Sequence, residues 1–178
     1  MIMSRAWAMP SADTFDVEPI GLLVRRYLHG VSVDPFARNK RWATHTNDLN
    51  PNTEAEHHMD ACSFMETLAR DGVVADTIIL DPPYSPRQVT EYYADAGIKA
   101  NAIDTSANFG TRIRASARLL CARGTTVMTF GWNSCGMGKG FDGIELLLVA
   151  HGGSHNDTIC FVEKMTQEQT ELFERSSA

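Results

Sequence analysis

The chain has 178 residues, 43% of them apolar and 21% charged, which is the composition of an ordinary globular protein long enough to bury one substantial core. A net charge of −6 argues against a generally basic nucleic-acid binder, although a local basic patch is compatible with it. The sequence shows no signal-peptide pattern and no apolar run long enough to span a bilayer, so we expect a cytoplasmic protein that does not enter a membrane.

The first half of the chain alternates between predicted helices and strands. Residues 1–14 show no periodicity, and we expect a loose arm there. Apolar residues at helical spacing predict a helix from Val17 to Tyr27, which Gly30 ends. The elements expected next are a short strand over Val31–Phe36, a strand over Ala43–Asn50, a helix over Ala61–Arg70 and a buried strand over Thr77–Leu80.

The second half continues the alternation and then closes with strands. Ser85 and Gln88 form a capping-box signature for a helix that ends at Gly97. The elements expected after it are an irregular segment over 98–109, a helix over Ile113–Cys121 stopped by Gly124, strands over Thr125–Trp132, Gly143–His151 and Asp157–Glu163, a hairpin turn over Gly152–Asn156, and a C-terminal helix capped by Thr166 and Gln169.

This order of elements predicts the fold class. Strands that alternate with helices indicate an α/β protein with a mostly parallel sheet in three layers, and the closing hairpin adds an antiparallel strand. We expect residues 1–178 to form a single domain.

The stretch TIILDPPYSP, from Thr77 to Pro86, carries the clearest chemical signal. A fully buried strand runs into Pro82 and Pro83, which stop it because neither can donate a hydrogen bond to a neighbouring strand. The stop leaves the Asp81 carboxylate and the Tyr84 ring at the carboxyl end of a strand, where open α/β sheets bind their ligands.

A carboxylate beside a backbone carbonyl presents two hydrogen-bond acceptors, which match the two N–H donors of a planar –NH2 group. Asp81 and the Pro82 carbonyl are the proposed acceptors, and the stiff Pro82-Pro83 backbone fixes the angle between them. Holding both N–H groups favours a pyramidal amine and frees its lone pair for attack. Tyr84 is expected to stack on the face of the ring that carries the amine.

At these residues the sequence resembles the S-adenosylmethionine-dependent amino-methyltransferases, whose motif is Asp/Asn-Pro-Pro-Tyr/Phe after a buried strand. The wider set TNDLNP, HMDA, LDPPYSPRQ, FGWNS and VAHGGSHNDTI looks like small phage-type or prophage-type adenine methyltransferases, over residues 14–164. The resemblance implies a Rossmann-like methyltransferase fold, S-adenosylmethionine as co-substrate, catalytic roles for Asp81, Pro82, Pro83 and Tyr84, and a phage or prophage product in a bacterial host.

The same resemblance assigns a cofactor site. Asp34, Pro35 and Phe36 match the first cofactor motif, although ARNKRW follows without a glycine and only eleven residues separate Phe36 from Asp48. Asp48, with Leu49, matches the acidic residue that binds the ribose hydroxyls, with a turn aspartate as the alternative. Asp60, with Ala61, matches the acceptor of the cofactor's adenine amine, and a helix N-cap is the alternative or an additional role. The segment Phe15–Ile20 is expected to cover the methionine moiety.

Substrate contacts are expected from the segments next to this motif. Arg87 follows the motif and is the arginine most suited to touch a phosphate. The glycine-rich segment Phe130–Phe141 is expected to be a substrate-facing loop on the sheet edge of Asp81, with Trp132 and Asn133 at the base pocket and Lys139 near phosphate. Its spacing differs from that of a nucleotide-hydrolysing phosphate loop.

No metal site is expected. The cysteines show no Cys-x-x-Cys pair, so we expect free buried thiols. The histidines lack metal-ligand spacing as well. The cysteines are Cys62, Cys121, Cys135 and Cys160, and the histidines in question are His57, His58, His151 and His155.

The expected function is methyl transfer from S-adenosylmethionine to the N6 amine of adenine in DNA. The alternatives are N4-cytosine transfer, RNA as the acceptor, and a cofactor-binding subunit without activity. The sequence offers no insertion long enough for a separate target-recognition domain. Specificity is therefore expected to be short, or to come from a partner protein or a second copy of the chain in a homodimer.

Overall fold

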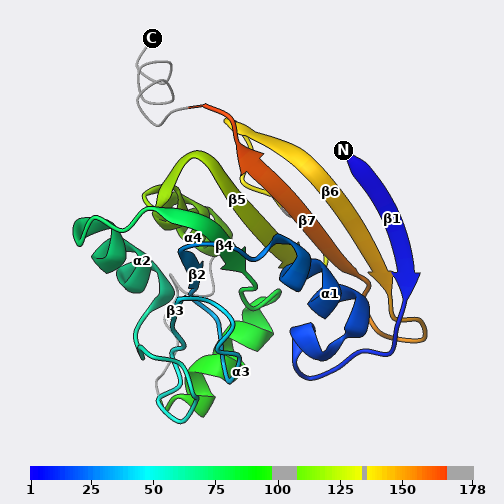
Figure 1. Cartoon of the computed structure of the whole chain (residues 1–178). Helices are drawn as coiled ribbons and strands as arrows, with labels where there is room; N and C mark the ends of the chain where they lie inside the picture. Colours follow the sequence, from blue (N-terminus) through cyan, green and yellow to red (C-terminus); the bar gives the residue numbers. More distant parts are fainter. Residues whose placement is uncertain (98–107, 134–135, 168–178) are drawn as a thin grey trace.

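The computed structural model describes residues 1–97, 108–133 and 136–167, which build an α/β fold around one seven-stranded mixed sheet (Figure 1). The strands lie in the order β1-β6-β7-β5-β4-β2-β3. Their bounds are β1 Ile2–Trp7, β2 Ser32–Asp34, β3 His45–Thr46, β4 Ala75–Leu80, β5 Cys121–Gly131, β6 Phe141–Ala150 and β7 Thr158–Met165. The helices are the 3-10 turn η1 Thr14–Asp16, α1 Glu18–Tyr27, α2 Ala61–Arg70, α3 Pro86–Asp95 and α4 Phe109–Arg118.

The sheet is parallel except at one strand. β7 pairs antiparallel with both of its neighbours, β5 and β6, whereas β1–β6, β2–β3, β2–β4 and β4–β5 are parallel pairs. A mostly parallel α/β sheet with a closing antiparallel hairpin was expected from the sequence, and the structure confirms it.

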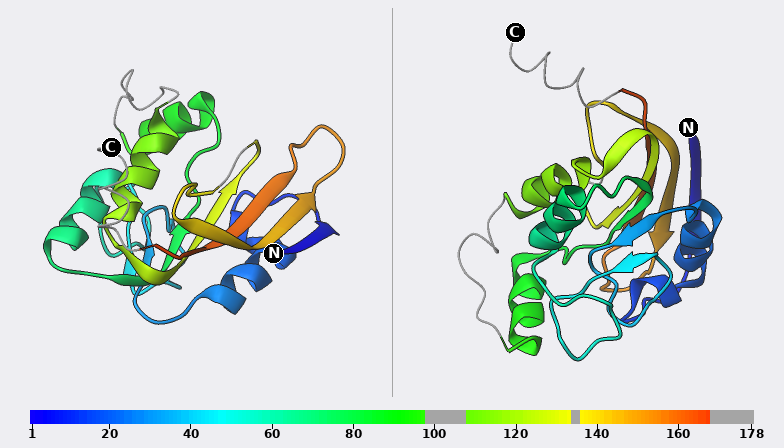
Figure 2. Two further views of the ribbon diagram at one scale, coloured as in Figure 1. Left: turned by 90° about the horizontal axis from the view of Figure 1, so that it is seen from above. Right: turned by 60° about the vertical axis from the view of Figure 1, so that its left-hand side comes forward.

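Helices cover the two faces of the sheet and bury two apolar clusters (Figures 1 and 2). On one face α1 packs Ile20, Leu23 and Val24 against strands β4 to β7. On the other face α2 and α4 pack Phe64, Met65 and Ile113 against β2, β4 and β5. These side chains are the periodic apolar positions of their helices, so the helical patterns in the sequence marked the core-facing sides correctly.

Helix α3 begins where the sequence predicted. The side chain of Ser85 accepts a hydrogen bond from the Gln88 N–H at 3.2 Å, and Pro86 occupies the first turn. The Gln88 side chain bonds the N–H of Tyr84 rather than that of the cap residue, at 2.7 Å. This contact ties the start of the helix to the segment that follows β4. Gly97 lies beyond the helix end with a φ of 73°.

The expectation of a loose arm over residues 1–14 is wrong. Residues Ile2–Trp7 form β1, which pairs parallel with β6 from Ile2 opposite Glu145 to Trp7 opposite Ala150. Most of β1 is exposed on both sides, so its sequence shows no alternation of apolar and polar residues. Backbone hydrogen bonds hold the strand, and they leave no pattern in the side chains.

The boundary between α4 and β5 also differs from expectation. The helix ends at Arg118 rather than Cys121, and Cys121 already pairs with Ala75 in the sheet. Gly124, with a φ of 103°, lies inside β5 close to a register shift, so it does not stop a helix. Leu120 and Cys121 are buried in either arrangement, and for this reason apolar spacing did not separate helix from strand here.

The structure confirms part of the cysteine prediction. Cys62, Cys121 and Cys160 are buried thiols that belong to no disulfide. Cys135, the segment 98–107 and most of the C-terminal helix expected after Thr166 lie outside the described residues.

Candidate active site

The carboxyl ends of β2 and β4 meet where the strand order reverses. The chain runs from β2 outward to β3 and returns on the other side of β2 as β4. Asp34 ends β2 and Asp81 follows the last residue of β4. Such a switch point is the usual ligand site of an open α/β sheet, because the connections leave on opposite faces and open a crevice there.

The Asp81 carboxylate lies in an environment that raises its pKa. Burial raises the pKa of Asp81 to about 6, although hydrogen bonds from Tyr84 and Thr14 limit the rise. The hydroxyl of Tyr84 donates its hydrogen bond to Asp81 Oδ1. Burial and the nearby Asp81 charge raise the pKa of Tyr84 as well, so the phenol stays protonated and remains a donor. Asp81 is thus a carboxylate that already accepts hydrogen bonds from the hydroxyl groups of Tyr84 and Thr14.

Asp81 opens onto a cavity of about 240 Å³. The residues that line its inner side are Asp81, Pro82, Pro83, Tyr84, Gln88 and Trp132. The Trp132 ring meets the Tyr84 ring edge-on, with centroids 5.4 Å apart. The lining also includes Pro10, Ser11 and Ala12 and the hairpin-turn residues His155 and Asn156. The predicted catalytic residues and Trp132 therefore face one space, lined by polar and aromatic side chains, that is large enough for a planar ring.

A second, smaller cavity of about 40 Å³ gathers most of the predicted cofactor residues. Phe36, Asp48, Leu49, Asp60 and Ala61 line it. Pro83 and Tyr92 line both this cavity and the larger one, so the two lie on either side of the Asp-Pro-Pro-Tyr segment. The five predicted residues come from three separate parts of the chain, and the sheet edge brings them together.

The Asp48 carboxylate is used within the fold. Its Oδ2 accepts the backbone N–H of Arg38 at 3.1 Å and its Oδ1 accepts that of Asn50 at 2.8 Å. Burial raises the pKa of Asp48, although these two backbone hydrogen bonds oppose the rise. Both interpretations of Asp48 therefore keep support, because it organises a turn and also lines the cavity.

Asp60 likewise combines two features. Its Oδ1 accepts the Ser63 N–H at 3.0 Å, so Asp60 is the N-cap of α2. The residue also lines the smaller cavity beside Ala61.

Asp34 ends β2 and Pro35 begins the turn after it, which supports the site. Asp34 is 1% exposed and its Oδ1 accepts the Phe36 N–H at 3.0 Å. The Pro35 carbonyl accepts the side-chain N–H of Asn47 at 3.2 Å. Burial raises the pKa of Asp34 well above its usual range. Both residues hold the turn that carries Phe36 to the cavity wall, and neither lines a cavity described here.

Two of the predicted substrate residues, Arg87 and Asn133, lie outside the cavities. Arg87 lies in the first turn of α3 with its side chain 87% exposed and paired to Glu91 at 2.7 Å. Asn133 is exposed just after β5. Neither residue lines one of these cavities. Arg87 lies at the start of α3 and Asn133 follows the end of β5, and both positions are at the Asp81 edge of the sheet.

The expectation that Lys139 shares the sheet edge of Asp81 is wrong. β6 runs parallel to β5, so the segment after β5 crosses from the carboxyl edge to the amino edge before Phe141 begins β6. Phe141 pairs with Met165, the last residue of β7, whereas Thr158 at the other end of β7 lines the large cavity. Lys139 therefore lies near the far edge, roughly 20 Å from the cavity at the rise of a strand.

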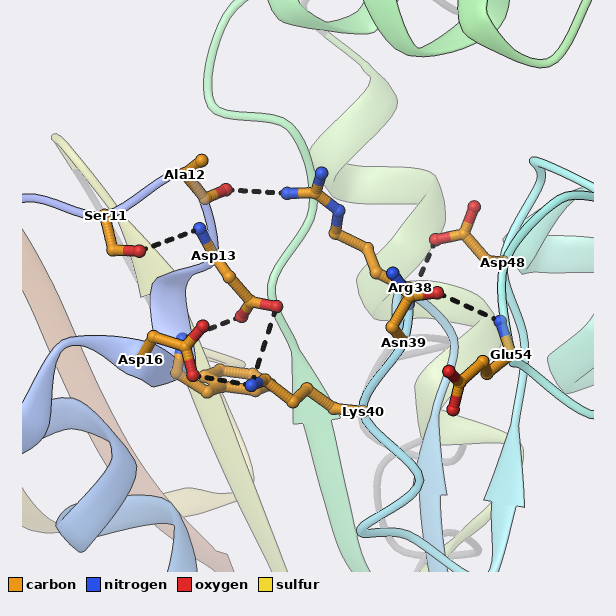
Figure 3. A network of polar contacts seen from close by, with 10 residues as sticks. Ser11, Ala12, Asp13, Asp16, Arg38, Asn39, Lys40, Asp48 and Glu54 are labelled. Atoms are coloured by element: carbon orange, nitrogen blue, oxygen red, sulfur yellow. Dashed lines mark hydrogen bonds and ion pairs between the residues drawn. The ribbon is translucent and has the colours of Figure 1, made fainter.

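An N-terminal strap, residues 8–16, crosses the site (Figure 3), although its residues up to Thr14 were expected to belong to a loose arm. Lys40 Nζ holds it through Asp16 Oδ1 at 2.6 Å and Asp13 Oδ2 at 3.8 Å. His151 holds its start, with the ring N–H at Nδ1 donating to the Ala8 carbonyl at 2.9 Å. Thr14, in the strap, contacts Asp81. The strap has no periodic pattern, but its polar residues next to Phe15 were a signal that a wall could form here.

Three other residues at the site also escaped the sequence reasoning. Tyr92 borders both cavities, although its place inside a predicted helix gives no indication of a site. His155 and Asn156 had been treated as ordinary turn residues. Turn composition predicts a hairpin and says nothing about what the hairpin tip faces.

Comparisons with known proteins give no assignment, because no family model matches the chain and no curated protein matches it significantly. Among the described residues we find no helix long and apolar enough to cross a membrane. The same part of the chain contains no group of three or more histidine, cysteine or acidic residues suited to hold a metal ion.

Proposed function

We propose that this protein transfers a methyl group from S-adenosylmethionine to the N6 amine of adenine in DNA. The observation that carries the proposal is the placement of Asp81-Pro82-Pro83-Tyr84 at the switch point of the sheet, between a large cavity and a smaller one. The mostly parallel sheet with one antiparallel strand is compatible with a Rossmann-like methyltransferase fold.

The larger cavity supports an extruded base as the acceptor. Asp81 and the Pro82 carbonyl accept the two N–H bonds of the exocyclic amine, and the rings of Tyr84 and Trp132 form an aromatic wall for the base. The incoming N–H takes the place of the Tyr84 hydroxyl on Asp81, because both are donors to the same carboxylate. Pro83 separates this space from the smaller cavity.

The smaller cavity supports an adenosine-like group. Its acidic residues, Asp48 and Asp60, suit ribose hydroxyls and an adenine amine, and Phe36 and Ala61 supply apolar contact. S-adenosylmethionine supplies an electrophilic methyl carbon bound to a sulfonium. As the amine nitrogen bonds to this carbon, the carbon–sulfur bond breaks, and Asp81 or water takes the proton that the methylated amine releases. The site contributes positioning and acceptors for developing positive charge.

The decisive test is an assay of the purified full chain with labelled S-adenosylmethionine and mixed-sequence DNA, followed by nucleoside analysis. N6-methyladenine is the expected product, and Asp81→Ala should nearly abolish it while cofactor affinity stays within about tenfold. Formation of N4-methylcytosine would show that cytosine is the acceptor, and labelling of RNA alone would show that RNA is the substrate. Cofactor binding without any transfer would leave the binding-subunit alternative, and near-normal turnover by Asp81→Ala would overturn the amine clamp.

A further inference from the structure

Arg38 has an unusual backbone conformation in the middle of the site. Its φ of 49° makes it the one residue other than glycine with a positive φ in the described parts of the chain. A non-glycine side chain costs about 1 kcal/mol there, and arginine lacks the local hydrogen bonding that lets asparagine tolerate this region. Glycine at this position would avoid the cost, so the arginine side chain needs a reason to be here.

The Arg38 guanidinium lies between the two cavities. Arg38 lines a third space of about 20 Å³ together with Asp81 and Pro83. Phe36 and Tyr92 line both this third space and the smaller cavity, so the two spaces are neighbours. Its charge lowers the pKa of Asp81 and of Asp48, which places the positive charge near both carboxylates. The group that joins an adenosine in one cavity to a reacting centre in the other must pass this point.

The guanidinium has spare hydrogen-bonding capacity. Within the described residues its one hydrogen bond goes from Nη1 to the Ala12 carbonyl at 2.6 Å, and its carbon lies 5.6 Å from the Tyr92 ring centroid. A guanidinium carries five N–H donors in a fork that fits a carboxylate. The Ala12 carbonyl is a neutral acceptor, and a carboxylate oxygen in its place would make a stronger, charge-assisted bond.

Asp13 lines the same small space and carries the opposite charge. Figure 3 shows its carboxylate on the side of Lys40. Its Oδ1 caps η1 by accepting the Phe15 N–H at 3.2 Å, and its Oδ2 lies 3.8 Å from Lys40 Nζ, a long ion-pair distance. The carboxylate therefore keeps lone pairs for a further donor. A cation and an anion that face one space are complementary to a zwitterion.

We propose that Arg38 and Asp13 bind the α-carboxylate and the α-ammonium of the amino-acid end of S-adenosylmethionine. This inference rests on the proposed function and adds the residues that select a cofactor carrying a free amino acid. Arg38 also restricts the length of the ligand, because its side chain lies at a fixed position between the smaller cavity and Asp81. The strap that carries Asp13 closes the site over the ligand's charged end.

The test compares two ligands that share the adenosine and the thioether sulfur. S-adenosylhomocysteine carries the amino-acid end, whereas 5′-methylthioadenosine lacks it. Calorimetry on wild type, Arg38→Gly and Asp13→Asn gives the affinities. Glycine suits a positive φ and asparagine keeps the cap of η1, so both variants should fold, and a thermal melt checks this. Arg41→Gly, which removes an exposed charge from the same loop, is the matched control.

Arg38→Gly and Asp13→Asn should each weaken S-adenosylhomocysteine binding roughly ten- to a hundredfold, the scale of a lost hydrogen bond to a charged group. Binding of 5′-methylthioadenosine should change by less than about twofold. Arg41→Gly should change neither. Equal losses for both ligands, or a changed DNA affinity with unchanged S-adenosylhomocysteine affinity, would overturn the inference while leaving the function standing. Failure of wild type to bind either ligand would remove the proposed function itself.

Discussion

At the scale of single residues, the site depends on a carboxylate that the fold makes costly to ionise. Burial raises the pKa of Asp81 to about 6, and the Tyr84 hydroxyl is the hydrogen-bond donor that opposes this rise most. An ionised carboxylate is the better acceptor for an amine, so transfer needs Asp81 deprotonated. Removing the Tyr84 hydroxyl should therefore change the pH dependence of the reaction more than its maximal rate.

Tyr84→Phe should retain methyl transfer within a few-fold at pH 8, because the ring still forms the wall beside Trp132 and no longer competes for Asp81. The acid limb of the pH profile of kcat/KM, which reports the free enzyme and is expected near pH 6 in wild type, should move to higher pH, because the lost hydrogen bond stabilised the charged carboxylate there. Steady-state rates across pH 5–9 measure both effects. Tyr84→Ala is the matched variant, and it should lose most activity at every pH. A Tyr84→Phe profile identical to wild type would show that Asp81 does not control the acid limb.

A substitution of Asp48 tests whether the smaller cavity binds the cofactor. Asp48→Ala should weaken S-adenosylmethionine binding by roughly 1.5–3 kcal/mol, the scale of a lost charge-assisted hydrogen bond. It should also lower the melting temperature, because the N–H groups of Arg38 and Asn50 lose their acceptor. Calorimetry and thermal unfolding separate the two effects. Asp60→Asn, which keeps an N-cap side chain, provides a comparison in the same cavity. Unchanged cofactor affinity with reduced stability would leave Asp48 as a turn residue alone.

At the scale of elements, strand direction decides which charged residues reach DNA. The segment after β5 crosses the sheet, so Lys139 and Arg87 lie at opposite edges although both were expected beside the substrate. Arg87 follows Pro86 at the start of α3, next to Gln88 of the large cavity. Its exposed pair with Glu91 contributes little stability and can be exchanged for a phosphate.

Arg87→Ala should lower DNA affinity similarly for unrelated sequences and flatten the dependence of log affinity on log salt by about 0.9, the contribution of one phosphate contact. Lys139→Ala should leave the slope unchanged, because the residue lies at the far edge of the sheet. Salt titrations on two unrelated duplexes measure both variants against wild type. An unchanged slope for Arg87→Ala with a flatter one for Lys139→Ala would place the DNA surface on the opposite edge.

At the scale of the whole molecule, the buried carboxyl groups of Asp34, Asp48 and Glu163 and the half-buried one of Asp81 make stability depend on pH. Burial raises the pKa of Asp34, Asp48, Asp81 and Glu163. A raised pKa in the folded state means that folding favours the protonated group, so this contribution is complete below the unfolded pKa and is lost as pH rises through the folded one. The ion pairs of the described residues mostly involve exposed side chains and oppose this trend only weakly.

For Asp81 the free energy of unfolding should therefore fall as the pH rises from about 4 and level off once the pH has passed about 6. Asp81→Asn should stabilise the protein at pH 8 by up to about 3 kcal/mol, which corresponds to a shift from 3.8 to about 6, and should have little effect near pH 4. Denaturant unfolding at several pH values measures this. Asp142→Asn, at an exposed position on β6, is the control and should change the curve little. A destabilised Asp81→Asn at pH 8 would contradict the assigned cost of the buried charge, whereas a stabilised but inactive variant would show that stability is sacrificed for function.

The sequence by itself determined the elements whose signals are local. Apolar spacing placed α1, α2 and α3, Ser85 and Gly97 set the ends of α3, and Pro82 and Pro83 ended β4 beside a carboxylate. These signals depend on neighbours within a few residues, which the chain order already supplies. The same reasoning placed Asp81, Tyr84, Asp48 and Asp60 at strand or helix ends, and therefore at one sheet edge.

Only the tertiary structure decided the rest. β1 is a strand because β6 offers it backbone partners, and its exposed side chains carry no periodicity. Lys139 lies far from the site because β6 runs parallel to β5. The residue pattern of one strand does not encode its direction relative to another strand. Arg38 lies between the cavities because Asp48, ten residues later, holds its N–H and the strap accepts its guanidinium. Such placements depend on strand order and on contacts between distant segments, so they arise only when the sheet assembles.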